Sequence, residues 1–318
     1  MQCCVILMKT LRVVIMKKLV LLLTLVMAGN CVAAESVHSD KCFDNGWNKK
    51  KYTQLKNNQF DAKQETIVQL TKQLRYCLAV TDPTVRDGIA YEAYFSWLRD
   101  GKITGVSLKS LFEQLSTELE VANPDSDGVY LPFVALVYAE IVRVDRVEPY
   151  LTDEERQRAV NTVAQYIDGI SDYRGFDKEV GYRHAIAHSA DIVLQLALNK
   201  SIDKSHIIVL VEAVAGQINP NSGHFYRYAE PERIARAIAY SMLRDDVELE
   251  FWQTWLEEVA DPKPFETWRE VFKSDKGLAK RNNTRQFLTN LYAMISPSEH
   301  PRLVELTPIV RELITTTG

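Results

Sequence analysis

Two histidines and an aspartate near the middle of the chain have the types and spacing that can bind a metal or move a proton. His184, His188 and Asp191 follow one another at intervals of four and three residues, and Gln195 continues the series. On a helix these intervals place the side chains in one narrow stripe. Imidazole nitrogens and carboxylate oxygens are ligands for divalent metals, and the same groups transfer protons. The stripe is therefore the first candidate for a functional site.

The rest of the segment 180–199 consists almost entirely of Ala, Ile, Leu and Val. A helix that is apolar around most of its circumference is buried, so we predict that the polar stripe faces an internal cleft. Three interpretations stay open: a hydrogen-bonded structural network, a divalent metal site, and metal-free catalysis or ligand binding. The zincin pattern is absent because Ala185 stands where that pattern has glutamate. No cofactor is required by the sequence.

Polar residues on both sides of this segment extend the candidate cleft. An acid and an arginine precede the stripe, and two further acids and an arginine follow it at the predicted start of a later helix. The alternative for these acids is favourable interaction with a helix dipole and surface ion pairing. The complete candidate cleft comprises Asp172, Arg174, Tyr182, His184, His188, Asp191, Glu230, Glu232 and Arg233.

The elements that position these residues are predicted to be helices. Apolar residues recur every three or four positions after residue 60 and rarely alternate, which favours helices over strands. The predicted helices lie around residues 67–78, 83–98, 107–120, 132–144, 152–170, 180–199, 206–218, 231–243, 246–259, 264–273, 284–295 and 307–314. We predict an all-α fold of stacked helical hairpins, an ARM/HEAT-like α-solenoid superhelix, with an α/α barrel as the alternative.

The N-terminus has the three parts of a secretory signal peptide. Met16-Lys17-Lys18 is a basic start, residues 19–29 are apolar, and Val32-Ala33-Ala34 is a small-residue cleavage site. The apolar run is shorter than the roughly 20 residues that a membrane-spanning helix needs, so cleavage is preferred to anchoring. We predict a cleaved signal peptide over residues 1–34 and export to the periplasm or beyond the cell. Translation starting at Met1 and at Met16 are both compatible with this pattern.

After cleavage we expect an N-terminal arm over residues 35–60 and one helical domain over residues 61–318. The remaining cysteines, Cys42 and Cys77, are predicted to form a disulfide in an oxidising compartment. Removal of the four basic residues of the signal peptide changes the formal charge from −4 to −8. An acidic chain is a poor candidate for nucleic-acid binding, and no membrane span is expected after cleavage.

The central segment resembles the bacterial DUF2785 family, a domain of unknown function. The resemblance rests on residues 172–176, which match D-x-R-G, and on residues 181–191, which match G-W-x-H-x-x-A-H-x-A-D with Tyr182 in place of Trp. Residues 84–87, 230–235 and 287–292 extend the match. This resemblance implies an all-helical protein, with a helical-repeat superhelix as the expected arrangement, and implies no activity.

Two functions from different classes follow. The first is an exported helical-repeat protein that binds a partner protein or a small ligand in a groove lined by the His184, His188 and Asp191 stripe. The alternative is a metal-dependent hydrolase in which Glu230 or Glu232 joins the stripe and a metal-bound water is activated. The sequence leaves open whether the protein is an enzyme.

Overall fold

The computed structural model describes residues 39–121 and 125–318, so the predicted signal peptide lies outside the described residues. The all-α prediction is confirmed for this part of the chain, whose only sheet has two short strands. The elements follow in the order η1 (Ser39–Phe43), α2 (Lys49–Asn57), α3 (Gln64–Cys77), α4 (Pro83–Val85), η2 (Arg86–Tyr91), α5 (Glu92–Arg99), α6 (Gly105–Glu120), α7 (Tyr130–Val147), α8 (Asp153–Gly169), β1 (Phe176–Asp177), β2 (Gly181–Tyr182), α9 (Ala185–Ala197), α10 (Lys204–Ile218), α11 (Glu230–Ser241), α12 (Leu249–Val259), α13 (Trp268–Val271), α14 (Asp275–Ile295) and α15 (Pro301–Thr316).

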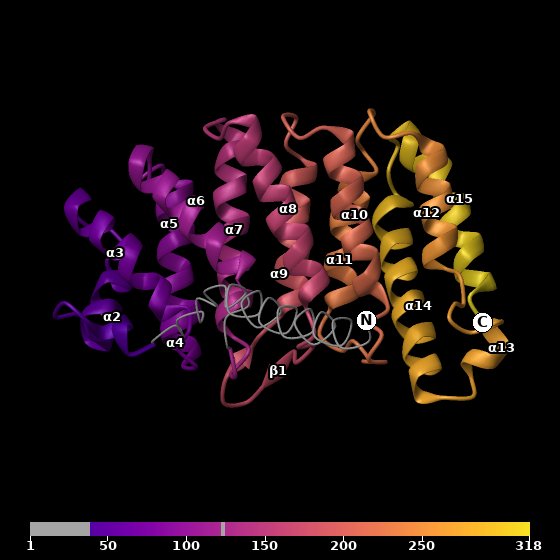
Figure 1. The fold of residues 1–318 in the computed structure, drawn as a ribbon, viewed down its shortest axis with the longest axis horizontal. Helices are drawn as coiled ribbons and strands as arrows, with labels where there is room; N and C mark the ends of the chain where they lie inside the picture. Colours follow the sequence, from indigo (N-terminus) through magenta and orange to yellow (C-terminus); the bar gives the residue numbers. More distant parts are fainter. Residues whose placement is uncertain (1–38, 122–124) are drawn as a thin grey trace, which may run out of the picture. The chain divides into compact units, whose positions relative to one another are not determined.

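Helices that alternate along the chain pack beside one another in two rows. One row contains α7, α9, α11 and α14, and the other contains α6, α8 and α10 (Figure 1). Helices consecutive in sequence connect the rows, as α6 packs on α7 and α10 packs on α11. A helix in the middle of a row, such as α9, therefore has neighbours on both sides. This explains why α9 is apolar around most of its circumference.

Several helix starts follow capping signals in the sequence. Thr152 and Glu155 form a capping box at α8, in which each side chain bonds the backbone N–H of the other residue. Asp203 accepts a hydrogen bond from the backbone of His206 at the start of α10. These oxygen acceptors satisfy N–H groups that have no partner within the helix.

The structure corrects the prediction at the start of the central helix. The segment predicted as helix over residues 180–199 becomes helical only at Ala185, because the preceding residues form the β1–β2 hairpin, in which Phe176 pairs with Tyr182. Asp177 accepts backbone hydrogen bonds from Glu179 and Val180, and this stabilises the turn. The expectation that no strand would occur was therefore wrong in this segment.

Two other regions also differ from the predicted boundaries. The segment predicted as an N-terminal arm contains α2, which begins after Asn48, whose side chain accepts a hydrogen bond from Lys51. Near the C-terminus α14 begins at Asp275 rather than at residue 284, and α13 spans only Trp268–Val271. The helix in the predicted arm was therefore not expected, whereas the predicted helices near the C-terminus exist with different ends.

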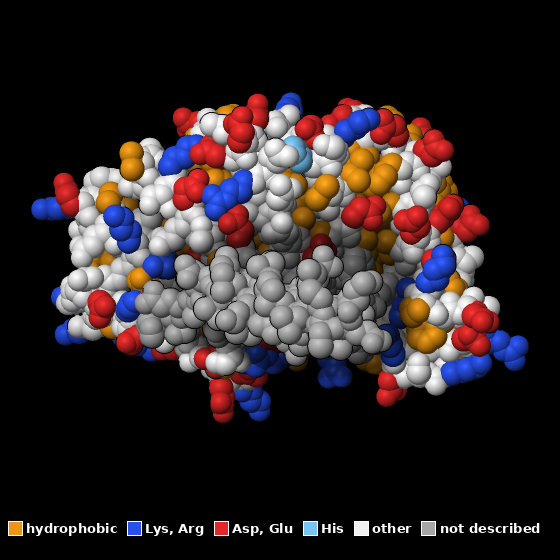
Figure 2. All heavy atoms as spheres, in the orientation of Figure 1, with side chains coloured by type: hydrophobic (Ala, Val, Ile, Leu, Met, Phe, Trp, Pro, Cys, Tyr) orange, Lys and Arg blue, Asp and Glu red, His pale blue; other side chains and the backbone are white. Residues whose placement is uncertain are grey.

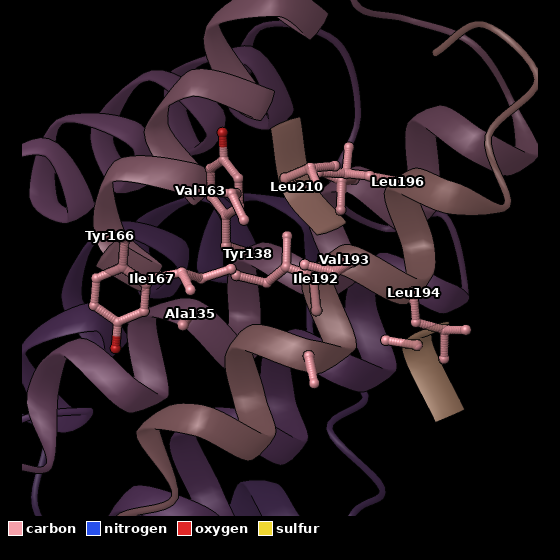
Figure 3. Close-up of a cluster of buried hydrophobic side chains, with 14 of the residues drawn as sticks. Ala135, Tyr138, Val163, Tyr166, Ile167, Ile192, Val193, Leu194, Leu196 and Leu210 are labelled. Carbon is pink, nitrogen blue, oxygen red and sulfur yellow. The ribbon is translucent and has the colours of Figure 1, made fainter. Parts of the chain in front are cut away.

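Facing helices share one apolar core. Figure 3 shows Tyr138 of α7, Val163 and Ile167 of α8, and Ile192 and Val193 of α9 converging from three helices. All five side chains are buried. On the outer face drawn in Figure 2, acidic and basic side chains are interspersed. The burial of apolar area between the rows is the main stabilising contribution to this arrangement.

The predicted disulfide is confirmed between Cys42 and Cys77. The two cysteines are fully buried, and the bond joins η1 to the end of α3. In the same pocket the Tyr52 hydroxyl of α2 donates to the Cys42 carbonyl oxygen at 2.7 Å. Among the described residues, no helix is both long enough and apolar enough to span a membrane.

Loss of the disulfide is expected to destabilise the protein. The bond closes a loop with a sequence separation of 35 residues. The loop-entropy relation then predicts that Cys42→Ala with Cys77→Ala lowers the free energy of unfolding by about 3 to 4 kcal/mol. Urea unfolding of the variant and the parent, both beginning at Glu35, measures this difference. Equal stability of the two proteins would contradict the prediction.

Candidate functional site

A buried arginine connects the N-terminal helices to the hairpin that precedes α9. Arg86 is fully buried at the first position of η2, a π-helical segment between α4 and α5. Its Nη2 donates to the carbonyl oxygens of Val180 at 2.8 Å and Tyr182 at 3.2 Å. Its Nε donates to the carboxylate of Asp87 at 2.7 Å. The hairpin backbone and one carboxylate thus compensate the buried cation.

Arg183 and Gly175 hold strand β1 of the hairpin in place. Arg183 is buried, donates from Nε to the carbonyl oxygen of Asp127 at 2.6 Å, and pairs with Asp177. Gly175 lies against the ring of Tyr228, since a Cβ built at Gly175 would be 1.9 Å from Tyr228 Cδ2. The chain therefore requires glycine at this position, and the hairpin is packed directly on the connection before α11.

His184 lies at the junction of the hairpin and α9 and not on the helix itself. It is the N-cap residue in the left-handed conformation, with φ 59° and ψ 36°. Its ring lies 4.2 Å from the ring of Tyr182, measured between centroids. The Nε2 atom is buried and has no hydrogen-bond partner within the described residues. Burial, with a smaller contribution from the Arg233 charge, lowers the pKa of His184 to about 4.

His188 lies on α9 and is almost completely buried, with 6% of its surface exposed. Its Nδ1 is 2.9 Å from the carbonyl oxygen of Pro132. Because a carbonyl oxygen only accepts, Nδ1 carries the hydrogen and Nε2 keeps its lone pair. The Phe133 ring contacts the imidazole edge-on. Burial, followed by the neighbouring His184, lowers the pKa of His188 to about 3.

The carboxylate of the stripe is bound to an arginine of the next helix. Asp191 accepts from Nε of Arg233 at 3.2 Å and also pairs with its Nη2. Burial raises the pKa of Asp191, and the Arg233 charge opposes that rise. Gln195 in turn accepts from Nε of Arg146 at 3.0 Å. The stripe therefore connects α9 to α11 through Asp191 and to α7 through Gln195.

The remaining predicted residues have separate positions. Asp172 and Arg174 pair with each other over Gly128, where a Cβ would be 2.2 Å from an Asp172 oxygen. Glu230 is buried and accepts from the Tyr228 backbone N–H at 2.8 Å. Glu232 is exposed. The structure thus brings Tyr182, His184, His188, Asp191 and Arg233 together. Asp172, Arg174 and Glu230 bond within the neighbouring loops instead, and Glu232 lies at the surface.

The sequence predicted Tyr182 as a site residue but not the two aromatic rings that lie beside it, Phe176 and Tyr228. We call Phe176, Tyr182 and Tyr228 the aromatic platform, whose ring centroids lie 4.9 to 6.5 Å apart. Phe176 is 44% exposed and Tyr182 is 45% exposed. The Phe176–Tyr182 pair results from the hairpin register, and a turn signal around Asp177 is the feature that would have predicted it. Arg86 was also missed as a site residue, although it lies within one of the family-like segments.

The described residues contain no cluster of three or more His, Cys, Asp or Glu side chains arranged to hold a metal ion. What the arrangement offers chemically is an apolar aromatic surface, a neutral imidazole with an unpartnered nitrogen, and an arginine paired with an aspartate.

Comparison with known proteins identifies a family. A family model described as "Protein of unknown function (DUF2785)" matches residues 115–293, which is more than half of the chain. The match includes the hairpin, α9 and α11. No curated protein matches the chain, and no solved structure does.

The two histidines are expected to make the protein sensitive to acid. An unfolded histidine has a pKa of about 6.5, whereas that of folded His188 is about 3. Below about pH 6.5 the unfolded state therefore binds a proton that folded His188 does not, and stability falls as the pH falls. His188 alone contributes up to about 1.4 kcal/mol per pH unit in this window. His184 contributes less because it is partly exposed.

Urea unfolding at about pH 7 and about pH 5 tests this expectation. The change in unfolding free energy between the two pH values should be smaller in His188→Gln, whose amide can still donate to the Pro132 carbonyl, than in the parent protein. The same pH dependence in both proteins would show that His188 is not buried in its neutral form.

Substitution of Gly175 is expected to disturb the hairpin. In Gly175→Ala the new methyl group collides with the Tyr228 ring, so we expect a loss of about 1 to 3 kcal/mol in the free energy of unfolding. Gly216→Ala is the matched control, because no atom lies within 4 Å of a Cβ built there. The control, within helix α10, should gain up to about 1 kcal/mol. Chemical denaturation measures both, and equal effects would contradict the proposed packing.

Proposed function

The chain belongs to the DUF2785 family, whose function is unknown, and from its site geometry we propose an exported binding protein that holds a peptide segment of a partner protein. The segment lies on the aromatic platform and reaches His184. The protein itself performs no chemistry in this proposal. This function is one of the two that the sequence suggests, and the exposed platform supports a binding position at the hairpin.

The observation that carries the proposal is the exposure of the platform on a rigidly held backbone. Phe176 and Tyr182 leave nearly half of their surfaces in water. The Tyr182 carbonyl is nevertheless bonded to the buried Arg86, and Phe176 pairs with Tyr182 in the hairpin. Exposed aromatic side chains that are contiguous and positioned by a buried scaffold are typical of interaction surfaces. Aromatic rings also lose little conformational entropy on binding because they have few rotatable bonds.

The surroundings of the platform favour a peptide. An aromatic or proline side chain can stack on the rings, and the partly exposed ring of His184 extends this surface next to Tyr182. With a pKa of about 4, His184 is neutral near pH 7, so uncharged groups of a peptide can lie beside its ring. Arg233 is one-third exposed at its side chain and offers a charge at the edge.

Two features support the remaining parts of the proposal. The Cys42–Cys77 disulfide supports export, because structural disulfides persist in oxidising compartments. The two rows of helices support an α-solenoid, because from α6 to α11 each helix packs on the next helix but one along the chain. An α/α barrel remains the alternative arrangement, and the periplasm and the extracellular space are both compatible destinations.

A metal-dependent hydrolase is the second candidate, favoured by the orientation of His188. Histidines that bind metals commonly donate Nδ1–H to a carbonyl and present Nε2, as His188 does toward Pro132. In this hypothesis His184 and Asp191 would be the other ligands, and Glu230 or Glu232, at the start of α11, would serve as base. Elemental analysis of protein purified without chelator tests this function. A stoichiometric metal that is lost in His184→Ala with His188→Ala would favour it over partner binding.

Selection from a displayed peptide library tests the binding function. Peptides selected on the chain beginning at Glu35 should share an aromatic residue or proline, and a synthetic peptide of that motif should bind in fluorescence polarisation. Tyr182→Ala should weaken its binding about tenfold or more, because the stacked ring is lost.

Phe272→Ala provides the matched control, because Phe272 is 53% exposed and lies outside the platform. This variant should bind the selected peptide as tightly as the parent protein does. The proposal fails if no common motif is selected, or if Tyr182→Ala and Phe272→Ala bind the peptide equally well.

A further inference from the structure

Five arginines form a continuous group on the row of helices that contains α9. Helices α5, α7, α9 and α11 lie next to one another in this row (Figure 1). Three contacts each join neighbouring helices of the row, and every one includes an arginine: Arg99 with Glu140, Arg146 with Gln195, and Arg233 with Asp191. We call Arg99, Arg143, Arg146, Arg233 and Arg236 the arginine face. These contacts make the face continuous over four helices.

Arg143 and Arg236 belong to the face because their charges reach its other members. Burial, followed by the charges of Arg143 and Arg99, lowers the pKa of Arg146. Burial raises the pKa of Asp191, and Arg236 is among the charges that oppose this rise. The cations of α5 and α7 therefore lie close enough to repel one another, and a bound anion would relieve that repulsion.

Three members of the face have no carboxylate partner. Arg146 bonds to the neutral amide of Gln195. Arg143 and Arg236 form no hydrogen bond or ion pair with any residue that the structure describes. Arg236 is exposed, and Arg143 and Arg146 are partly exposed. All three guanidinium groups can therefore pair with an external anion.

Cations exceed acids on the face although the chain as a whole is acidic. Glu140 and Asp191 are the paired acids, and the exposed Glu232 lies one turn before Arg236 without an ion pair to it. Five arginines thus stand against three acids, whereas the chain beginning at Glu35 has a formal charge of −8. Such a local reversal of charge favours an anionic partner.

The extent of the face fits a segment of chain. Neighbouring packed helices lie about 8–10 Å apart, so four helices in a row cover about 27 Å between the outer axes. An extended peptide rises about 3.3 Å per residue, so about eight residues span this distance. Guanidinium groups bind carboxylates through two parallel hydrogen bonds, and clusters of arginines recognise acidic motifs in this way.

We propose that the arginine face binds an extended acidic segment of a partner protein, whose carboxylates pair with Arg143, Arg146 and Arg236. Glu140 and Asp191 interrupt the positive charge, so acids separated by neutral residues fit better than the uniform charge of a nucleic acid. The choice of a protein as the partner rests on the proposed peptide-binding function, whereas the position of the site does not.

Fluorescence polarisation with a labelled octapeptide of alternating Glu and Ser, the Glu peptide, tests the face. The protein is the chain beginning at Glu35, and an octapeptide of alternating Gln and Ser with the same label is the control. Saturable binding is expected for the Glu peptide only. Its affinity should be about tenfold higher at about 20 mM salt than at about 200 mM salt, because salt screens charges at a surface.

The double variant Arg143→Gln with Arg236→Gln removes two cations that have no protein partner. It should weaken binding of the Glu peptide about tenfold, which is the combined effect of two partly exposed ion pairs. Its urea midpoint should not be lower than that of the parent protein, because no contact among the described residues is lost.

Arg269→Gln with Arg311→Gln is the matched control. Both arginines are exposed, lie outside the face on α13 and α15, and form no hydrogen bond or ion pair with the described residues. The control changes the net charge equally, so it separates the effect of position from that of overall charge. It should bind the Glu peptide like the parent protein.

Three results would overturn the proposal. One is equal binding of the Glu and Gln peptides at low salt. Another is equal affinity of the two double variants for the Glu peptide. The third is tighter binding of a single-stranded DNA pentamer, which has as many charges as the Glu peptide and would assign the face to a nucleic acid.

Tyr182→Ala distinguishes a failure of the arginine face from a failure of the platform. The Glu peptide has no aromatic residue, so this variant should bind it like the parent protein even if the platform binds no peptide. Loss of Glu peptide binding in Tyr182→Ala would place the peptide on the platform and contradict binding at the arginine face.

Discussion

Compensation of one buried cation organises the site. The guanidinium of Arg86 is fully removed from water, and such a charge is tolerated only when surrounding groups replace its hydration. The carbonyl oxygens of Val180 and Tyr182 do so on one side, and the carboxylate of Asp87 does so on another. Because these carbonyl oxygens must contact Arg86, the hairpin packs against the N-terminal helices. The Tyr182 side chain then faces outward.

The same cation also reaches the buried histidine. The Arg86 guanidinium lies 4.4 Å from the Phe133 ring centroid, and Phe133 contacts His188 edge-on. His188 in turn bonds to the carbonyl of Pro132. The left-handed backbone of His184, which costs roughly 1 to 3 kcal/mol, lies between these contacts and the hairpin. Such strain persists because the contacts on both sides determine where the chain must turn.

The polar stripe thus has different roles along its length. His188, Asp191 and Gln195 each bond to a neighbouring helix, which is the behaviour of a structural network. His184 differs because its buried Nε2 has no partner among the described residues and its ring contacts Tyr182. The proposed binding surface therefore lies at the hairpin before α9 and not on the face of α9. There the exposed rings are carried by a backbone that buried contacts hold in place.

Features that depend on local periodicity, or for which the residues leave few alternatives, were predictable from the residues alone. The spacing of apolar residues predicted the helices, the two remaining cysteines predicted the disulfide, and the spacing of the polar residues from His184 to Gln195 predicted the stripe. Helical periodicity and loop closure act over short stretches of chain, so their signals are present in the residues themselves. The motif at residues 181–191 likewise sufficed to indicate the family.

The partners of the stripe residues and the positions of the rings depend instead on contacts between distant parts of the chain. The Asp191–Arg233 pair and the contact of Gly175 with Tyr228 join residues more than 40 positions apart. The hairpin replaced a predicted helical turn because Arg86, distant in sequence, bonds to its carbonyl oxygens. Local helix propensity and the burial of a remote cation compete in this segment. Because Arg86 is distant in sequence, residues 180–184 alone do not predict which of the two prevails.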